Sequence, residues 1–435
     1  MNNVELAVHF LLQLAVILFV CRIVGLIAAR LGQPQVVAEM IAGVCLGPSL
    51  WGAIPGIREW QGALFPWDPS QQTRDTQSYL FPASQLGLAL YMFVVGMEFR
   101  VEIIRQSWKS SVMVSIAGML APFILGGLLG WFFHRHTMLF PPQTTPLEAI
   151  LFLGAAMCIT AFPMLARIIH FKGLAGTRMG TVAIGAGAID DAAAWCLLAV
   201  VLASFDRQPA SALLNVGGGL LFASATVLVV RPLLWRLQAW LIVQDRLTDA
   251  GAVVGLCCMA LGAFTTDAIG LHAVFGAFLM GTAIPRGTFS RDLTQLIQPL
   301  TVLLLLPLFF VFSGLNTQIG LLNSVHLWLM CGLVVAAAFL GKGVACWLTA
   351  QATGLPRHEA MGLGVLMNAR GLMELIIINI GLQRGVITAE LFATLVIMAV
   401  VSTLLASPLF ERLMRRPSRS AAVVDSESAF TGKRS

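Results

Sequence analysis

The chain is divided into apolar segments that are each about as long as a bilayer is thick. We predict thirteen of them, at residues 6–29, 34–50, 84–99, 111–133, 147–169, 179–204, 213–234, 248–266, 269–284, 298–315, 324–349, 359–382 and 389–410. A helix needs about 20 residues to cross the hydrocarbon core, and it satisfies its own backbone hydrogen bonds there. The sequence therefore predicts an all-α polytopic membrane protein, with a transmembrane domain at 1–414 and a disordered cytoplasmic tail at 415–435.

The composition supports a membrane protein and narrows its chemistry. Charged residues make up only 11% of the 435 residues, against about 25% in soluble domains. The eight cysteines lie in or beside apolar stretches, without CxxC pairs or His/Cys clusters, so we expect no disulfide framework, zinc site or other cofactor. The net charge of +6 comes from basic residues in short loops, so we expect the lipid bilayer, and not a nucleic acid, as the partner.

The basic residues also predict an orientation. With the N-terminus outside, 19 Lys and Arg residues fall in cytoplasmic loops or the tail and five fall outside. Cytoplasmic loops of membrane proteins carry an excess of Lys and Arg. The sequence therefore predicts an odd number of crossings and a cytoplasmic C-terminus, and we expect a bacterial inner membrane as the location.

Two adjacent carboxylates, Asp190 and Asp191, interrupt the apolar segment at 179–204. Each costs roughly 2.5–3.5 kcal/mol at the centre of a membrane helix, and such residues commonly mark ion or proton pathways. Lys342 lies in the middle of another segment, from which its side chain reaches a membrane interface only with difficulty. Pairing with a carboxylate is therefore the favoured way to neutralise its charge. Neighbouring helical residues point about 100° apart, so we expect Lys342 to pair with one aspartate while the other faces a water-filled cavity.

An unpaired carboxylate in that position can bind either of two ligands. Its oxygens suit a hard cation, and its removal from water favours a bound proton. Competition between a proton and a cation for the same oxygens is the minimum chemistry of an exchanger.

Two segments contain residues that break a helix. Pro163 removes a backbone donor and frees the carbonyl of Ile159, close to Thr160, and Asn368, Arg370 and Gly371 interrupt the twelfth segment. These two segments are seven apart in the count, so segments 1–6 and 8–13 are predicted to be inverted repeats joined by segment 7, as in many secondary transporters. The alternative is that Pro163 only kinks a packed helix.

Arg370 and Glu374 allow two interpretations. They are four residues apart on one helix face, where a pair can simply neutralise itself. The other interpretation is a role beside the helix break.

Seven stretches together resemble the monovalent cation:proton antiporter-2 family, of the sodium/proton exchanger superfamily. They are MFVVGMEF (92–99), ITAFPMLARII (159–169), AIDDAAAW (188–195), GLHAVFGAFLMGTAIP (270–285), PLFFVFSGL (307–315), FLGKG (339–343) and NARGLMELIIINIG (368–381). The last stretch and the residues after it are most similar to the plant and bacterial cation/proton exchanger branch. The Asp-Asp pair is instead similar to electrogenic sodium/proton antiporters, so the ion remains open between sodium and potassium.

The resemblance implies a role for each of these residues. Asp191 would be the main cation- and proton-binding carboxylate and would hold the monovalent cation transiently, while Asp190 would pair with Lys342. The two broken helices, interrupted at Thr160–Pro163 and Asn368–Gly371, would cross beside them. The resemblance further implies a homodimer in which a core domain moves against a dimerisation domain.

We therefore expect a secondary active transporter, not an enzyme, that exchanges Na⁺ or K⁺ for H⁺ by alternating access. A channel or uniporter on the same fold would move the cation without protons, and a transporter-like sensor would move neither. An intramembrane aspartyl protease needs two aspartates that share a proton across facing helices, whereas Asp190 and Asp191 are neighbours that point apart.

Overall fold

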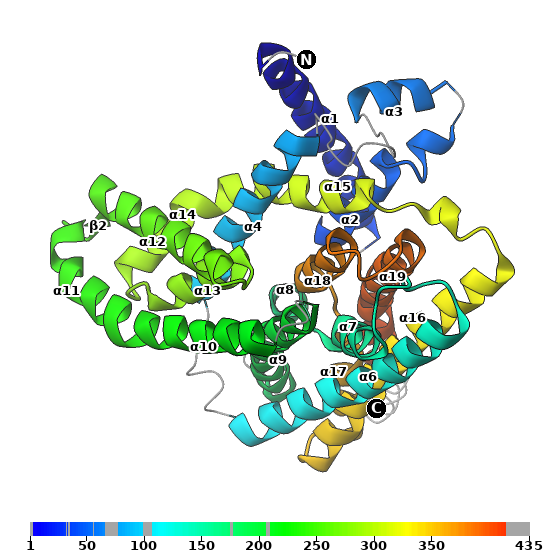
Figure 1. The fold of residues 1–435 in the computed structure, drawn as a ribbon. Coiled ribbons are helices and arrows are strands. Elements are labelled where there is room, and N and C mark those ends of the chain that lie inside the picture. The colour runs from blue at the N-terminus through cyan, green and yellow to red at the C-terminus, as the bar shows by residue number, and fades with distance from the viewer. Residues whose placement is uncertain are drawn as a thin grey trace, which may run out of the picture.

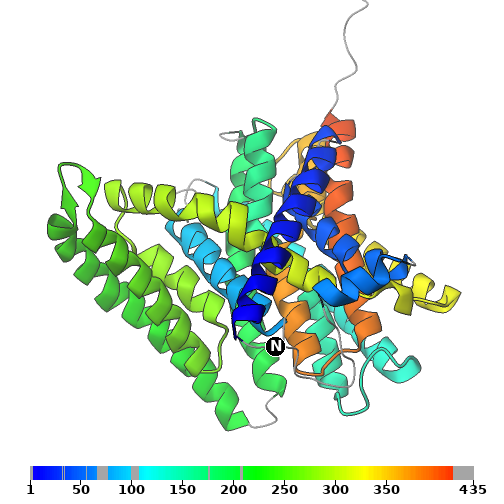
Figure 2. The same cartoon turned by 90° about the horizontal axis from the view of Figure 1, so that it is seen from above.

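The computed structural model describes residues 3–31, 33, 35–54, 56–65, 77–98, 107–174, 177–205 and 209–414. Almost all of them are helical, and the helices pack in two groups that lie side by side (Figures 1 and 2). We name each group after a helix near its centre.

The α15 bundle contains the helices from the N-terminus and the middle of the chain. They are α1 (Asn3–Arg30), α2 (Gln35–Leu46), α3 (Arg58–Leu64), α4 (Gln77–Glu98), α10 (Pro209–Ala225), α11 (Arg231–Leu241), α12 (Asp249–Ala268), α13 (Ala273–Ala283), α14 (Thr288–Leu300) and α15 (Leu306–Leu315). In this group α15 packs on α2 and α4, and α13 packs on α4 and α12. Short 3₁₀ turns stand at Trp51–Ala53 and Ile319–Leu321, and a small hairpin of β1 (Ile242–Val243) and β2 (Arg246–Leu247) joins α11 to α12.

The α9 bundle contains eight helices from two separate stretches of the chain. They are α6 (Trp108–His136), α7 (Pro146–Cys158), α8 (Phe162–Phe171), α9 (Arg178–Phe205), α16 (Val325–Ala352), α17 (Arg357–Leu366), α18 (Leu372–Gln383) and α19 (Ala389–Met414). Helix α6 packs along α7, α9 and α16, and α19 packs on α16, α17 and α18. The two stretches are thereby interleaved around α9, near the centre of Figure 1.

The predicted fold class is confirmed, with differences in detail. Each predicted segment contains a described helix or part of one. Among the described residues, nine helices are long and apolar enough to cross a membrane, and four further apolar helices are shorter, so thirteen crossings stays a prediction. The segment expected at 84–99 begins earlier, at Gln77, and the connection before it contains α3. The tail at 415–435 lies outside the described residues.

Two helices of the α15 bundle contain a wider turn that the sequence analysis did not predict. The π-turns η2 (Thr226–Val230) and η3 (Thr301–Leu305) join α10 to α11 and α14 to α15. In each turn, the residue before a proline donates its backbone N–H to the carbonyl five residues earlier. Arg231 donates to the Thr226 carbonyl, and Leu306 donates to the Thr301 carbonyl. The following residues, Pro232 and Pro307, have no N–H to continue an ordinary ladder. The π-turn takes up this interruption without ending the helix.

Glycines allow the closest helix contacts. A Cβ added at Gly43 would meet the backbone of Phe310 and Val311, and one added at Gly314 would meet the backbone of Gly43. In the α9 bundle, Gly126 and its neighbours face the backbone of α7 in the same way. Small residues at such positions let helices approach closely in membranes.

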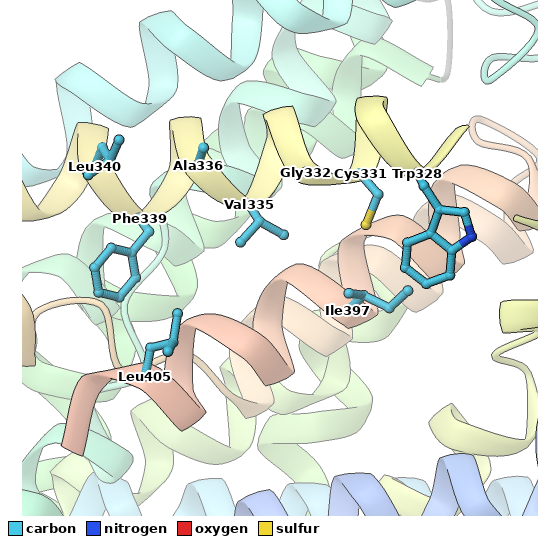
Figure 3. Close-up of a pocket in the computed structure, with 9 residues that line it drawn as sticks. All are labelled: Trp328, Cys331, Gly332, Val335, Ala336, Phe339, Leu340, Ile397 and Leu405. Carbon is cyan, nitrogen blue, oxygen red and sulfur yellow. The ribbon is translucent and has the colours of Figure 1, made fainter. Parts of the chain in front are cut away.

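An open apolar groove lies between α16 and α19, on the surface of the α9 bundle (Figure 3). Its wall on α16 runs from Trp328 to Leu340, and Ile397 and Leu405 of α19 face it. None of the charged residues of the α9 bundle lines it.

Side-chain hydrogen bonds join described residues of the two bundles. The Asn379 Nδ2 of α18 donates to the Ser313 Oγ of α15 at 3.0 Å. The Gln33 Nε2, in the connection between α1 and α2, donates to the Leu404 carbonyl of α19 at 3.2 Å.

Candidate functional site

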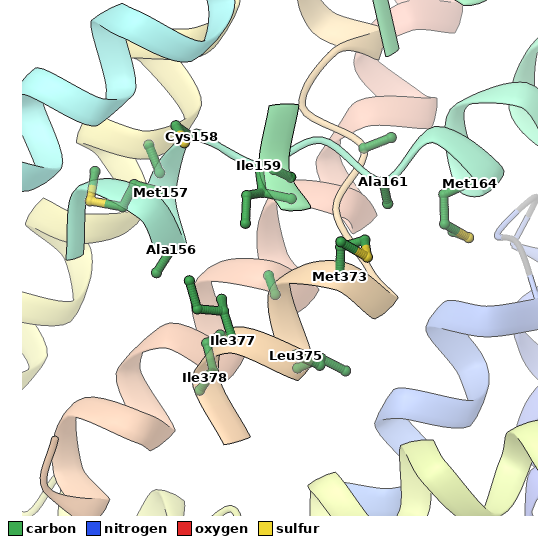
Figure 4. Packing of buried hydrophobic residues seen from close by; sticks show 14 of the residues in the cluster. Ala156, Met157, Cys158, Ile159, Ala161, Met164, Met373, Leu375, Ile377 and Ile378 are labelled. Atoms are coloured by element: carbon green, nitrogen blue, oxygen red, sulfur yellow. The ribbon is translucent and has the colours of Figure 1, made fainter. Parts of the chain in front are cut away.

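Two interrupted helices meet inside the α9 bundle. Helix α7 ends at Cys158 and α8 begins at Phe162, while α17 ends at Leu366 and α18 begins at Leu372. The extended links between them cross, and the Ala161 N–H donates to the Ala369 carbonyl at 3.1 Å. Figure 4 shows the link at Ile159 and Ala161 passing beside the chain that enters α18. The predicted breaks at Thr160 and Gly371 therefore lie together.

The break differs from the expected one at Pro163. This residue lies in the first turn of α8, where a helix does not need its N–H group. The chain is already extended at Ile159, which is the residue that follows α7. The proline thus starts the second half-helix, and it neither kinks a continuous helix nor interrupts one from within.

Two buried cations lie at the carboxyl end of α7. The Arg370 guanidinium donates to the Met157 carbonyl at 2.7 Å and to the Ala156 carbonyl at 3.4 Å. The Lys342 ammonium donates to the Cys158 carbonyl. The last carbonyls of a helix have no partner within it and carry partial negative charge, so two cations here satisfy them. These contacts could not be predicted from the sequence, because nothing in the residue spacing links α7 to α16 or α18.

Asp190 is surrounded by donors. Its Oδ2 accepts a hydrogen bond from Thr160 Oγ1 at 2.5 Å and lies 3.3 Å from Lys342 Nζ. Its Oδ1 accepts a hydrogen bond from Ser115 Oγ of α6 at 2.6 Å. Asp190, Thr160 and Lys342 are all 0% exposed. The contact expected between Lys342 and the aspartate pair is therefore present, and Ser115 is an additional member that the sequence analysis did not identify.

Asp191 has the opposite surroundings. It is 0% exposed, and neither of its oxygens has a hydrogen-bond partner among the described residues. Helical geometry turns it about 100° from Asp190, away from the donors that Asp190 binds. A buried carboxylate without donors is costly when ionised, and it becomes acceptable when it binds a proton or a cation. This pair thus provides one carboxylate that is occupied by hydrogen-bond donors and one that is open, in the sense that no described donor binds it.

Arg370 and Glu374 satisfy both interpretations of the sequence. Their Nη1 and Oε1 atoms lie 3.2 Å apart, which is the self-neutralising pair, and Arg370 also holds the end of α7. The Arg370 N–H donates to Thr403 Oγ1 of α19 at 3.0 Å, which fixes the chain where it leaves the crossing. The Nδ2 of Asn368 donates to the Gly364 carbonyl at 3.0 Å, so Asn368 closes the end of α17.

Known proteins resemble the chain over nearly all of its length. The model of the transmembrane sodium/hydrogen exchanger family matches residues 15–416. The Na⁺/H⁺ antiporter NhaS4 of Synechocystis sp. is 37% identical over 411 residues, which cover 94% of this chain and 98% of that protein. Cation/H⁺ antiporter 15 of Arabidopsis thaliana is 33% identical over 95% of this chain, which spans 49% of that longer protein.

A solved structure supports the fold independently. The sodium proton antiporter MjNhaP1 of Methanocaldococcus jannaschii superimposes with a TM-score of 0.63, covering 93% of this chain and 96% of the other at 16% identity. The chain therefore belongs to the sodium/hydrogen exchanger family, a family of transporters and not of enzymes.

Proposed function

We propose that the chain exchanges Na⁺ or K⁺ for protons across a membrane by alternating access, with Asp191 as the carboxylate that binds both. The observation that carries this proposal is the contrast between the two aspartates. Asp190 is occupied by Ser115, Thr160 and Lys342, whereas both oxygens of the buried Asp191 are open. An open carboxylate beside a neutralised one can take a proton or a monovalent cation, and each expels the other.

The crossing gives this site its electrostatic setting. Arg370 and Lys342 neutralise the end of α7 and the paired carboxylates, so that Asp191 carries the charge that a transported ion must balance. The membrane potential adds about 2.3 kcal/mol per charge per 100 mV to any net charge that moves. With the proton gradient directed inward, the exchange would export the cation.

We extend the proposal to the arrangement of the protein. The transmembrane domain would occupy residues 1–414, with its N-terminus outside and its C-terminus in the cytoplasm of a bacterial cell, and it would function as a homodimer. The pairs α7–α8 and α17–α18 would occupy equivalent places in two inverted repeats. Their shared interruption and their contact at Ala161 and Ala369 support this symmetry.

The test is proton flux in proteoliposomes with an imposed pH gradient and a pH-sensitive dye. NaCl, KCl and choline chloride are added in turn to the wild type and to Asp191→Asn, which keeps the size of the side chain and removes its charge. We expect at least one alkali cation to dissipate the gradient in the wild type, and at least a hundredfold slower exchange in the variant.

Two results would overturn the proposal. Wild-type exchange rates in Asp191→Asn would remove this residue from the site. Cation flux without proton movement in the folded wild type would favour the channel or uniporter, and flux of neither ion would favour the sensor.

A further inference from the structure

Ser115 is the one donor to the aspartate pair that comes from α6. We propose that Ser115 is a positioning residue of the exchanger, which holds the Asp190 carboxylate turned away from Asp191 during the transport cycle. The inference deepens the proposed function and rests on it.

The distances separate the roles of the donors around Asp190. The two hydroxyl contacts are short, at 2.6 Å from Ser115 and 2.5 Å from Thr160. The Lys342 ammonium is farther away, at 3.3 Å. Ser115 alone of these three binds Oδ1, while the others share Oδ2. Its loss would leave one whole side of the carboxylate without a donor.

The uncharged hydroxyl of Ser115 complements the charged Lys342 ammonium at Asp190. The Lys342 ammonium donates hydrogen bonds both to Asp190 and to the Cys158 carbonyl. Its contact with Asp190 can therefore change when an ion binds at Asp191. Ser115 is 1% exposed, so its hydroxyl is out of contact with bulk solvent in this conformation. Ser115 therefore holds the charge on Asp190 in a fixed direction whichever ion occupies Asp191.

Several ionisable groups surround Asp190 and act on it besides Ser115. Asp191 on α9 itself, Cys158 on α7, and Lys342 and Cys346 on α16 interact with Asp190 directly. Arg370 and Glu374 interact in turn with Cys158 and Lys342. Helix α6 contributes hydroxyl groups at this level, Ser111 and Ser115, and no charge. Replacing Ser115 thus changes hydrogen bonding to Asp190 and leaves the number of buried charges unaltered.

The neighbouring Ser111 offers a matched control. It lies one turn earlier on α6, is 0% exposed, and donates to the backbone carbonyl of Val182 on α9 at 3.4 Å. Ser111→Ala and Ser115→Ala remove the same atom from the same helix interface. Only the second removes a donor from Asp190.

The experiment compares the pH profile of cation-dependent proton exchange in wild type, Ser115→Ala, Ser115→Thr and Ser111→Ala proteoliposomes. Without this bond the Asp190 carboxylate can turn toward Asp191, and its negative charge then favours proton binding at Asp191. We therefore expect the acid limb of the Ser115→Ala profile, where protons displace the cation from Asp191, to move about one pH unit higher, a tenfold change in proton competition. Ser115→Thr keeps the hydroxyl and should restore the wild-type limb, and Ser111→Ala should not move it.

The inference is overturned if the Ser115→Ala limb coincides with the wild type, or if Ser111→Ala moves it equally. If Ser115→Ala does not fold, we use Ser115→Cys, whose side chain is of similar size and is a weak donor, and we expect the same shift. A wild-type acid limb in that variant would also overturn the inference. A wild type without exchange would instead refute the proposed function, so the two failures are distinct.

Discussion

At the scale of single residues, Arg370 does the most to hold the crossing together. It is 0% exposed, and its guanidinium reaches two carbonyls of α7 and the Glu374 carboxylate. A planar group with five donors suits such a set, which a lysine cannot satisfy in the same geometry. Arg370 therefore binds the end of one broken helix to the start of the other.

We predict that Arg370→Met destabilises the protein by about 3–5 kcal/mol, because it leaves Glu374 and the α7 carbonyls without their cation. Thermal unfolding in detergent should show a lower midpoint, with Arg370→Lys in between. Adding Glu374→Gln should recover part of the loss, since it removes the unpaired charge. Arg357→Met, at the exposed start of α17, is the control and should leave the midpoint unchanged. An unchanged midpoint in Arg370→Met would show that these contacts contribute nothing to folding.

The residues that could be recognised from the sequence are those whose chemistry conflicts with lipid. Asp190, Asp191 and Lys342 stand out because a charge in an apolar segment is rare and needs a reason. Ser115 could not be recognised, because serine is common in membrane helices and its partner lies 75 residues away. The sequence reveals an unusual cost, whereas an ordinary residue gains its role only from the fold.

At the scale of elements, α2 and α15 are in close backbone contact. Gly43 and Gly314 face each other so closely that a Cβ on either would meet the backbone of the other helix. In a membrane this packing replaces the hydrophobic driving force that joins helices in water. The contact depends on both residues remaining glycine.

We predict that Gly314→Ala lowers stability by about 1–3 kcal/mol, because backbone atoms cannot move aside as a flexible side chain can. The measurement is the fraction of monodisperse protein that remains after heating, by size-exclusion chromatography. Gly332→Ala on α16 is the matched control, since a Cβ there meets nothing within 4 Å. It should be neutral or gain up to about 1 kcal/mol from helix propensity. Equal behaviour of the two variants would contradict the packing argument.

Helix positions were predictable from the sequence to a few residues, but their internal irregularities were not. Apolar length locates a crossing, since the bilayer imposes it. The π-turns that start at Thr226 and Thr301 each precede a proline, but a proline can equally kink a helix, end it or begin it. At Pro163 it begins one. The neighbouring helices decide between these outcomes, and the sequence of one segment does not contain them.

At the scale of the whole molecule, the α9 bundle carries the two buried ion pairs and the α15 bundle lies against it. Apolar side chains of both bundles share one buried cluster, and a hydrogen bond between Asn379 and Ser313 also joins them. Alternating access would require the two bodies to move relative to each other at this interface.

We predict that joining the bundles stops exchange. In a background without the native cysteines, Ser313→Cys with Asn379→Cys should lose most of its exchange after treatment with a thiol cross-linker of short reach. Ser49→Cys with Thr317→Cys is the control, because this pair lies within the α15 bundle, where Ser49 donates to the Thr317 carbonyl at 2.6 Å. Cross-linking is verified by the gel mobility of a chain cleaved between the two positions. Full exchange by the cross-linked Ser313→Cys/Asn379→Cys variant would show that the bundles do not need to separate there.

The two buried ion pairs also have a consequence for the protein when no transported ion is bound. Lys342 with Asp190 and Arg370 with Glu374 cancel in sign, which leaves Asp191 as a single uncompensated negative charge. One proton or one monovalent cation makes the assembly neutral, whereas an empty site would have to carry a bare charge through a low-dielectric interior. If Asp191 is the transport site, we therefore expect the unloaded protein to resist the conformational change, which would suppress a leak of either ion alone.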